Sequence, residues 1–168
     1  MLFLWIIGCN AIDESEARLT FTALGEPLTD LRDEAIESED EQINISLTLG
    51  NNWEGTATAS GTMIEDGLQD IYPLTVTLTD VYVPTEDVTI SGTISFGVEY
   101  FLDPTDVSSY EKKSSVDGEV TISGDAKGIA DLAYQFQEVY DADGSSSFSA
   151  SGTISGFEVS QFTTGEQP

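Results

Sequence analysis

Hydrophobic and polar residues alternate along most of the chain. In the longest run, residues 88 to 102, the even positions are apolar or glycine, and most odd positions are Ser, Thr or Glu. A period of two is typical of a β-strand with one buried face and one solvated face. Similar runs cover residues 43 to 49, 74 to 79 and 120 to 136, and Leu19, Phe21 and Ala23 suggest a shorter first strand. The pattern therefore predicts an all-β protein.

The connections between these runs are short and rich in turn residues. Asp-Gly pairs, which favour tight hairpin turns, occupy positions 66 and 67, 117 and 118, and 143 and 144. Connections of this length leave no room for crossover helices, so neighbouring strands are expected to be antiparallel. We predict an antiparallel meander of about seven to nine strands that forms a coiled sheet, a barrel or a two-layer sandwich, with no substantial helix.

One acidic segment departs from the alternation. Residues 28 to 42 contain good helix formers, but Leu28, Leu31 and Ala35 make only a weak apolar stripe. We expect an acidic loop over residues 25 to 42 with one or two helical turns. A single β domain over residues 18 to 163 would hold this loop, and residues 164 to 168 would form a tail.

A short Ser-Gly motif recurs at intervals of about 30 residues. The copies are Ser60-Gly61, Ser91-Gly92, Ser123-Gly124 and Ser151-Gly152. A glycine on the apolar side of a strand weakens it unless the glycine permits a bend, a bulge or a close approach by another side chain. Such bends would coil the sheet. The alternative is chance recurrence in a chain rich in Ser, Gly and Thr.

Composition narrows the classes of function. Lys and Arg number five against 31 Asp and Glu, which gives a formal charge of -26. Such a chain repels nucleic acid, so we predict no nucleic-acid partner. There is no histidine, which excludes a Ser-His-Asp triad, a Cys-His pair and any histidine metal site. The few basic residues are too scattered for a phosphate cradle, and we predict no enzymatic activity.

The only cysteine, Cys9, follows an apolar run at the start of the sequence. Ile6, Ile7, Gly8 and Cys9 resemble the lipobox of prokaryotic lipoproteins, in which aliphatic residues and a small residue precede the cysteine. The resemblance covers about the first ten residues. It implies a signal peptide over residues 1 to 8, cleavage before Cys9, fatty acyl chains such as palmitate on the new terminus, and a lipid-anchored tether over residues 9 to 17.

The lipobox resemblance also implies a location. Each buried methylene adds about 0.8 kcal/mol, so two or three acyl chains hold a protein firmly on a membrane. The expected location is the cell envelope, and Asn10 after the cysteine implies the outer membrane in a Gram-negative organism. The alternative is that residues 1 to 9 form a terminal buried strand in which Cys9 is a small core residue.

Calcium is the one cofactor that the sequence suggests. Asp141, Asp143 and Ser145 resemble the opening of an EF-hand loop, with alternate oxygen donors around a glycine. The closing glutamate is absent, because Gly152 occupies that place. The alternative is a plain Asp-Gly hairpin turn.

Aromatic residues on the apolar side of the strands suggest a second candidate site. They are Phe96, Tyr100, Tyr134, Phe136, Tyr140 and Phe148. They could line a barrel mouth or an apolar groove that takes a ligand, or they could simply fill the core.

Together these features predict a lipid-anchored cell-envelope protein that acts as a non-enzymatic binding or structural module, with the membrane and an envelope component or protein as its partners. Two alternatives stay open. One is a carrier whose coiled sheet encloses an apolar ligand, and the other is a calcium-stabilised surface adhesion domain.

Overall fold

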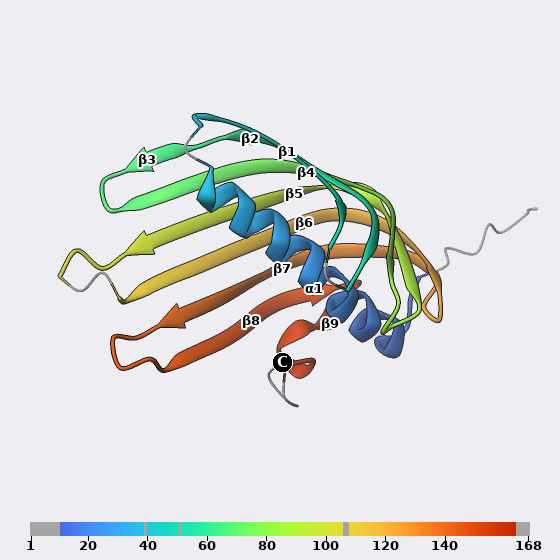
Figure 1. The fold of residues 1–168 in the computed structure, drawn as a ribbon. Helices are drawn as coiled ribbons and strands as arrows, with labels where there is room; N and C mark the ends of the chain where they lie inside the picture. The colour runs from blue at the N-terminus through green and yellow to red at the C-terminus, as the bar shows by residue number, and fades with distance from the viewer. Residues whose placement is uncertain (1–10, 39, 51, 106–107, 164–168) are drawn as a thin grey trace, which may run out of the picture.

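The computed structural model describes residues 11–38, 40–50, 52–105 and 108–163. One curved sheet and one long helix dominate this part of the chain (Figure 1). The helix α1 spans Glu14–Glu37, and a short 3-10 helix, η1, spans Val159–Gln161. The strands are β1 (Gln42–Leu49), β2 (Glu54–Thr62), β3 (Ile64–Asp66), β4 (Gln69–Val83), β5 (Val88–Leu102), β6 (Tyr110–Gly124), β7 (Gly128–Tyr140), β8 (Ser146–Ile154) and β9 (Phe157–Glu158).

The sheet is an antiparallel meander, as the alternating pattern predicts. Its nine strands run in the order β1-β2-β4-β5-β6-β7-β8-β9, and the short β3 pairs with β4 beside this path. All strand pairs are antiparallel. The described strands do not close into a barrel, because β1 and β9 lie at opposite ends of the order. Of the three predicted forms, the structure has the coiled open sheet.

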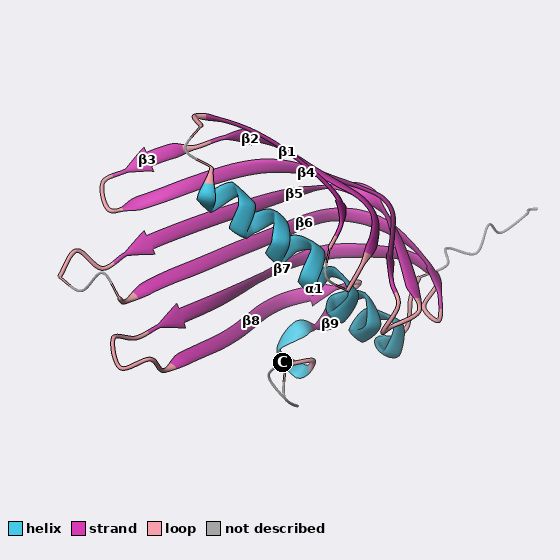
Figure 2. Ribbon diagram, viewed as in Figure 1, coloured by secondary structure: helices cyan, strands magenta, loops and turns pink. Residues whose placement is uncertain are grey.

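The helix covers the concave face of this sheet (Figure 2). Leu24, Leu28 and Leu31 of α1 are fully buried, and they belong to the same hydrophobic core as Val76 of β4 and Phe96 of β5. Burying one such side chain stabilises the fold by about 1.5–3 kcal/mol relative to leaving it exposed. The helix therefore supplies the second layer that a single sheet needs to bury its apolar face.

Local sequence explains where α1 begins. Asp13 caps the first turn by accepting a hydrogen bond from the Glu16 amide, and the Glu16 carboxylate accepts one from the Asp13 amide. This reciprocal pair is a capping box, and acidic residues in a first turn also favour the helix dipole. Pro27 lies inside the helix, where it removes one backbone hydrogen bond. Packing against the sheet compensates, because Pro27 is itself buried.

The helix corrects three expectations drawn from the sequence. The segment predicted as an acidic loop over residues 25 to 42 is mostly helical, the short strand at Leu19, Phe21 and Ala23 does not form, and the prediction of no substantial helix missed these 24 residues. The buried positions of α1 recur every three or four residues, which is the helical period. They are Ala17, Thr20, Ala23, Leu24, Pro27, Leu28, Leu31, Arg32 and Ala35.

The predicted tether also overlaps the folded domain. Ala11 forms a parallel bridge with Ile129 of β7, and Ile12 is buried in the core. Residues 14 to 17 belong to the first turn of α1. A tether over residues 9 to 17 is therefore wrong from residue 11 onward, because the apolar side chain of Ile12 finds a place in the core.

Two details of the predicted strands also differ. The run over residues 120 to 136 is two strands, β6 and β7, because the alternation continues through the turn, where Ala126 is buried like a strand residue. Asp117 and Gly118, predicted as a turn, lie inside β6. Gly118 has a φ of 137° and pairs with Ile94 of β5 without ending the strand.

The glycines of the recurring Ser-Gly motif lie where neighbouring main chains come close. At each of the four positions, an added Cβ would collide with a backbone oxygen of an adjacent strand or turn. The pairs are Gly61 with Pro73, Gly92 with Glu119, Gly124 with Asp87 and Gly152 with Ala133. Close approach therefore explains all four glycines, but the nearest approaching atom is a backbone oxygen and not the side chain that the sequence led us to expect.

Candidate functional site

The two ends of the curved sheet differ in what they carry. Ala11, the first described residue, pairs with Ile129 near the start of β7, at what we call the proximal end. The hairpins β3–β4, β5–β6 and β7–β8 project from the opposite, distal end (Figure 1). From Ile129 to Glu138, β7 rises about 30 Å at 3.3 Å per residue. The N-terminal segment therefore joins the domain far from the distal hairpins.

Half-exposed aromatic and charged residues gather on the concave face near the distal end. They lie on paired positions of β5, β6, β7 and β8, so their side chains point to the same face. We call this group the distal patch; it consists of Tyr100, Tyr110, Lys112, Glu138, Tyr140 and Phe148. In this set Phe148 is the most open residue, at 38% exposure. The remaining members lie partly sheltered, between core and solvent.

An ionic network centred on the buried Arg32 joins the distal patch to α1. Arg32 is 1% exposed, and its Nε donates to Asp33 Oδ1 at 3.0 Å. Its Nη2 donates to Glu138 Oε2 at 3.1 Å. Lys112 Nζ donates to the same Asp33 oxygen at 2.9 Å. Two cations and two carboxylates thus link the helix to β6 and β7.

The charges of Arg32 and Asp33 are stabilised by their partners in the network. Burial lowers the pKa of the Arg32 guanidinium, but the hydrogen bond to Asp33 and the charge of Glu138 outweigh burial, so the pKa is raised above its usual value. Burial raises the pKa of the Asp33 carboxyl, but hydrogen bonds from Lys112 and Arg32 outweigh it and hold the pKa below 3.8. Both side chains are therefore charged at neutral pH.

One nitrogen of the Arg32 guanidinium makes no hydrogen bond to the described residues. This atom, Nη1, is buried. The guanidinium carbon lies 5.8 Å from the centre of the Phe136 ring, which is a favourable distance for a cation above an aromatic face. The ring thus offsets part of the cost of burying this cation.

The tyrosines of the distal patch form a stack. The rings of Tyr110 and Tyr140 stack with centroids 4.4 Å apart, and Tyr100 lies 6.0 Å from Tyr110. Lys112 Nζ lies 5.8 Å from the Tyr110 centroid. Burial raises the pKa of Tyr100 and of Tyr140, so both phenols stay protonated and can donate hydrogen bonds. Such a surface offers flat apolar faces beside hydroxyl donors, which is typical of binding surfaces.

The aromatic residues that the sequence singled out fall into two groups in the structure, residues of the core and residues exposed on the concave face. Phe96 is fully buried, and Tyr134 is buried beneath α1 with its ring 5.6 Å from that of Phe21. Phe148 lies at the distal patch, and Phe136 lies between core and patch, 6.3 Å from Phe148. Phe96 and Tyr134 are core residues, and only Tyr100, Tyr140 and Phe148 reach the exposed concave surface.

The predicted calcium ligands lie in the turn between β7 and β8. The Ser145 amide donates to Asp143 Oδ1 at 2.8 Å, and the Ser145 hydroxyl donates to Asp141 Oδ2 at 3.3 Å. The hydroxyl and amide of Ser145 lower the pKa of Asp143. Within the described ranges, no three Asp, Glu, Cys or His residues are grouped to hold a metal ion. The turn is thus closed by its own hydrogen bonds, which is what the alternative of a plain hairpin turn predicts, and calcium binding there is untested.

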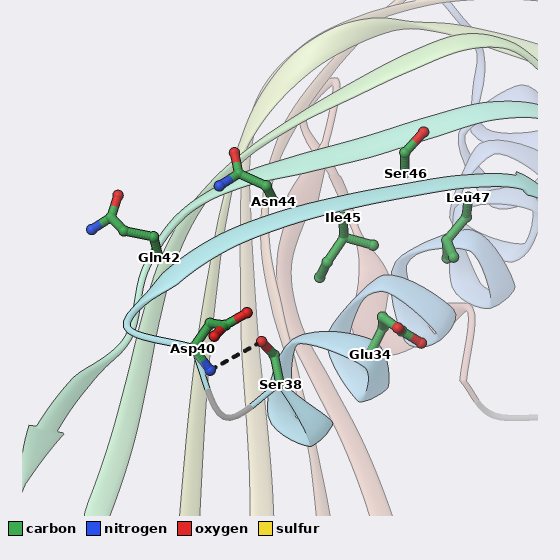
Figure 3. Close-up of a pocket in the computed structure, with 8 residues that line it drawn as sticks. All are labelled: Glu34, Ser38, Asp40, Gln42, Asn44, Ile45, Ser46 and Leu47. Atoms are coloured by element: carbon green, nitrogen blue, oxygen red, sulfur yellow. Dashed lines mark hydrogen bonds between the residues drawn. The ribbon is translucent and has the colours of Figure 1, made fainter.

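A polar groove of about 350 Å³ runs between the C-terminal part of α1 and the edge strand β1 (Figure 3). Ile45 and Leu47 point from β1 toward the helix, whereas Asn44 and Ser46 point away from it. The lining residues are Glu34, Ser38, Asp40, Gln42, Asn44, Ile45, Ser46 and Leu47. Two of these are acidic and none is basic.

The lipobox residues Ile6, Ile7, Gly8 and Cys9 lie outside the described residues, so lipidation of Cys9 stays a prediction. In the part of the chain that the structure describes, no helix has the length and the apolarity needed to cross a membrane. Comparisons with protein-family models, with curated proteins and with solved structures found no match to this chain.

Sequence reasoning missed the ionic network, although two signals point to it. Arg32 lies four residues after Leu28, inside the buried stripe of α1, where a charged residue needs a partner. Glu138 continues the buried side of β7 two residues after Phe136. A basic and an acidic residue that both lie on buried faces can be expected to form an ion pair. This expectation requires that the helix be recognised first, because only then does Arg32 fall on a buried face.

Proposed function

We propose that the chain is a lipid-anchored, non-enzymatic binding module of the cell envelope. The observation that supports this most directly is the separation of the two ends. Ala11 joins the sheet at the proximal end, about 30 Å along β7 from Glu138. A lipid on Cys9, two residues before Ala11, would leave the distal patch directed away from the membrane and open to a partner.

The ionic network favours binding over catalysis. Asp33 pairs with both Arg32 and Lys112, and the shifted pKa values of Arg32 and Asp33 keep these two side chains charged at neutral pH. A general acid or base instead needs a pKa near the working pH. The network therefore fits a role in fixing α1 on the sheet and shaping the surface beside it.

The packing of the core favours a module over a carrier. An enclosed ligand would need space beside the inward aromatics, but Phe96 is fully buried and Tyr134 packs edge-on against Phe21. On the concave face, α1 covers these aromatic residues, so the part of that face left open to a partner is the distal patch.

The intact mass of the full chain, expressed in a bacterium that processes lipoproteins and extracted from its membranes with detergent, tests the anchor. We expect the mass to show loss of residues 1 to 8 and addition of a diacylglycerol, with or without a further acyl chain. Cys9→Ser is the matched control and should keep its first eight residues and gain no lipid. An unmodified full-length chain in the soluble fraction would contradict the proposal.

A further inference from the structure

Among the described residues, no strand pairs with the outer side of the edge strand β1, which leaves a row of its backbone groups open. Exposed edge strands are usually blunted by lysine, by proline or by a bulge, because an open edge pairs readily with another strand. The residues of β1 read QINISLTL and include no proline and no charge. Its pairing with β2 is regular from Gln42 to Leu47, and the register shifts only beyond Leu47. Six consecutive residues thus form a regularly paired edge without a bulge.

The hydrogen-bond ladder shows which backbone groups are available. The Met63 amide donates to the Glu41 carbonyl at 3.0 Å, so this pair is hydrogen-bonded. Bonded and non-bonded pairs alternate in an antiparallel ladder. Ile43, Ile45 and Leu47 therefore bond to β2, and the amides and carbonyls of Gln42, Asn44 and Ser46 point away from the sheet. An added strand would meet donors and acceptors at three alternate positions.

The groove beside this edge indicates the chemistry of the added strand. Ile45 and Leu47 are half-buried and face α1, so they offer apolar contact to one face of the added strand. Glu34 and Asp40 line the same groove, and no basic residue does. The groove therefore favours lysine or arginine among apolar residues.

We propose that β1 binds an extended, basic segment of a partner protein by strand addition, with backbone bonds at Gln42, Asn44 and Ser46 and basic side chains toward Glu34 and Asp40. A second copy of this chain fits poorly, because each copy carries a formal charge of -26 and copies repel one another. Main-chain bonds give affinity in strand addition, and side chains give specificity. This inference names the partner class of the proposed binding module, but it does not depend on the lipid anchor.

Fluorescence anisotropy with the full chain tests the assignment. The probe is a labelled ten-residue peptide that alternates lysine with valine, and the control peptide replaces every lysine with glutamate. We expect saturable binding of the lysine peptide, at least tenfold tighter than that of the glutamate peptide. Raising sodium chloride from 50 to 500 mM should weaken binding, because salt screens exposed charges. Equal binding of both peptides, or none of either, would overturn the proposal.

Two pairs of variants separate strand addition from simple charge attraction. Asn44→Pro removes an outward amide at an edge position where proline is tolerated, and it should weaken binding at least tenfold. Asn44→Ala keeps the amide and should bind normally. Glu34→Gln with Asp40→Asn should weaken binding about twofold to tenfold. Asp117→Asn with Glu119→Gln removes equal charge from the exposed face of β6 and should change binding little. If Asn44→Pro leaves the affinity for the lysine peptide unchanged, strand addition is overturned.

Amide hydrogen exchange gives a readout that does not depend on any variant. Peptide binding should slow exchange at Gln42, Asn44 and Ser46 and leave the distal patch unchanged. Slowed exchange at the distal patch instead would overturn the assignment to β1. Sedimentation of the chain alone tests whether a second copy of the chain binds to β1. Self-association that Asn44→Pro abolishes would show that a second copy occupies this edge and would overturn the proposal. Because these assays do not need the lipid, their failure is distinguishable from failure of the anchor.

Discussion

Arg32 shows how one side chain can define the contact between α1 and the sheet. It is buried in the helix stripe, yet its guanidinium reaches Asp33 on the same helix and Glu138 on β7. Lys112 completes the network from β6. A buried cation is costly unless paired, so this arrangement tolerates little change in the position of the helix relative to β6 and β7.

Replacing Arg32 should therefore destabilise the fold strongly. Arg32→Ala leaves Glu138 without its cation and opens space beneath Phe136, and we expect a loss of about 3 kcal/mol or more in the free energy of unfolding. The double variant Arg32→Met with Glu138→Gln fills the space and removes the unpaired charge, so its free energy of unfolding should fall by less than that of Arg32→Ala. Urea unfolding measures both.

Arg18→Ala is the matched control for Arg32. Arg18 is exposed and lies 5.1 Å from the centre of the Phe162 ring. An exposed cation above an aromatic ring contributes about 0.5–1 kcal/mol. If the two alanine variants lose the same stability, the buried network does not hold the helix as described.

Several strands of this fold, β5 above all, were predictable from the sequence, and the helix was not. Period-two alternation survives wherever one face of a strand is buried, so the limits of β5 can be found from the sequence alone. In α1, Gly25 and Pro27 interrupt the helical pattern in the middle of the segment, and its polar side is strongly acidic. The capping box at Asp13 and Glu16 was the local signal that could have revealed its start.

The candidate site could be predicted only in part, for the same reason. Tyr100 and Phe148 lie on the apolar side of the alternating strands, so the sequence indicates that they face the concave side. Which part of that side stays open depends on the path of α1. The exposure of the distal patch and the burial of Phe96 therefore follow from the helix, which the alternation does not predict.

At the scale of the strands, two glycine substitutions should have opposite effects. Gly124 has a φ of 109°, and an added Cβ would collide with the Asp87 carbonyl, so Gly124→Ala should destabilise the fold by about 1–3 kcal/mol. Gly25 lies in α1 with open space around it, so Gly25→Ala should stabilise by about 0.5–1 kcal/mol. Thermal melting of both variants measures the difference. Equal effects would show that close strand approach at the recurring motif is not needed.

At the scale of the whole molecule, charge and architecture act against each other. Five basic residues cannot pair with 31 acidic ones, so most carboxylates repel their neighbours. The curved sheet and α1 nevertheless bury a continuous hydrophobic core. The folded state therefore balances apolar burial against electrostatic repulsion, and the surrounding salt shifts that balance.

Raising sodium chloride from 0.05 to 1 M should raise the melting temperature of the full chain. Each kcal/mol gained corresponds to about 2–4 °C in a domain of this size, and we expect a rise of at least that amount. Calcium chloride at equal ionic strength should give no further rise, because no three acidic residues among the described ones are grouped to hold a metal ion. A further rise with calcium that Asp143→Asn removes would establish a site at this turn. A melting temperature unchanged by either salt would show that repulsion among the carboxylates does not limit stability.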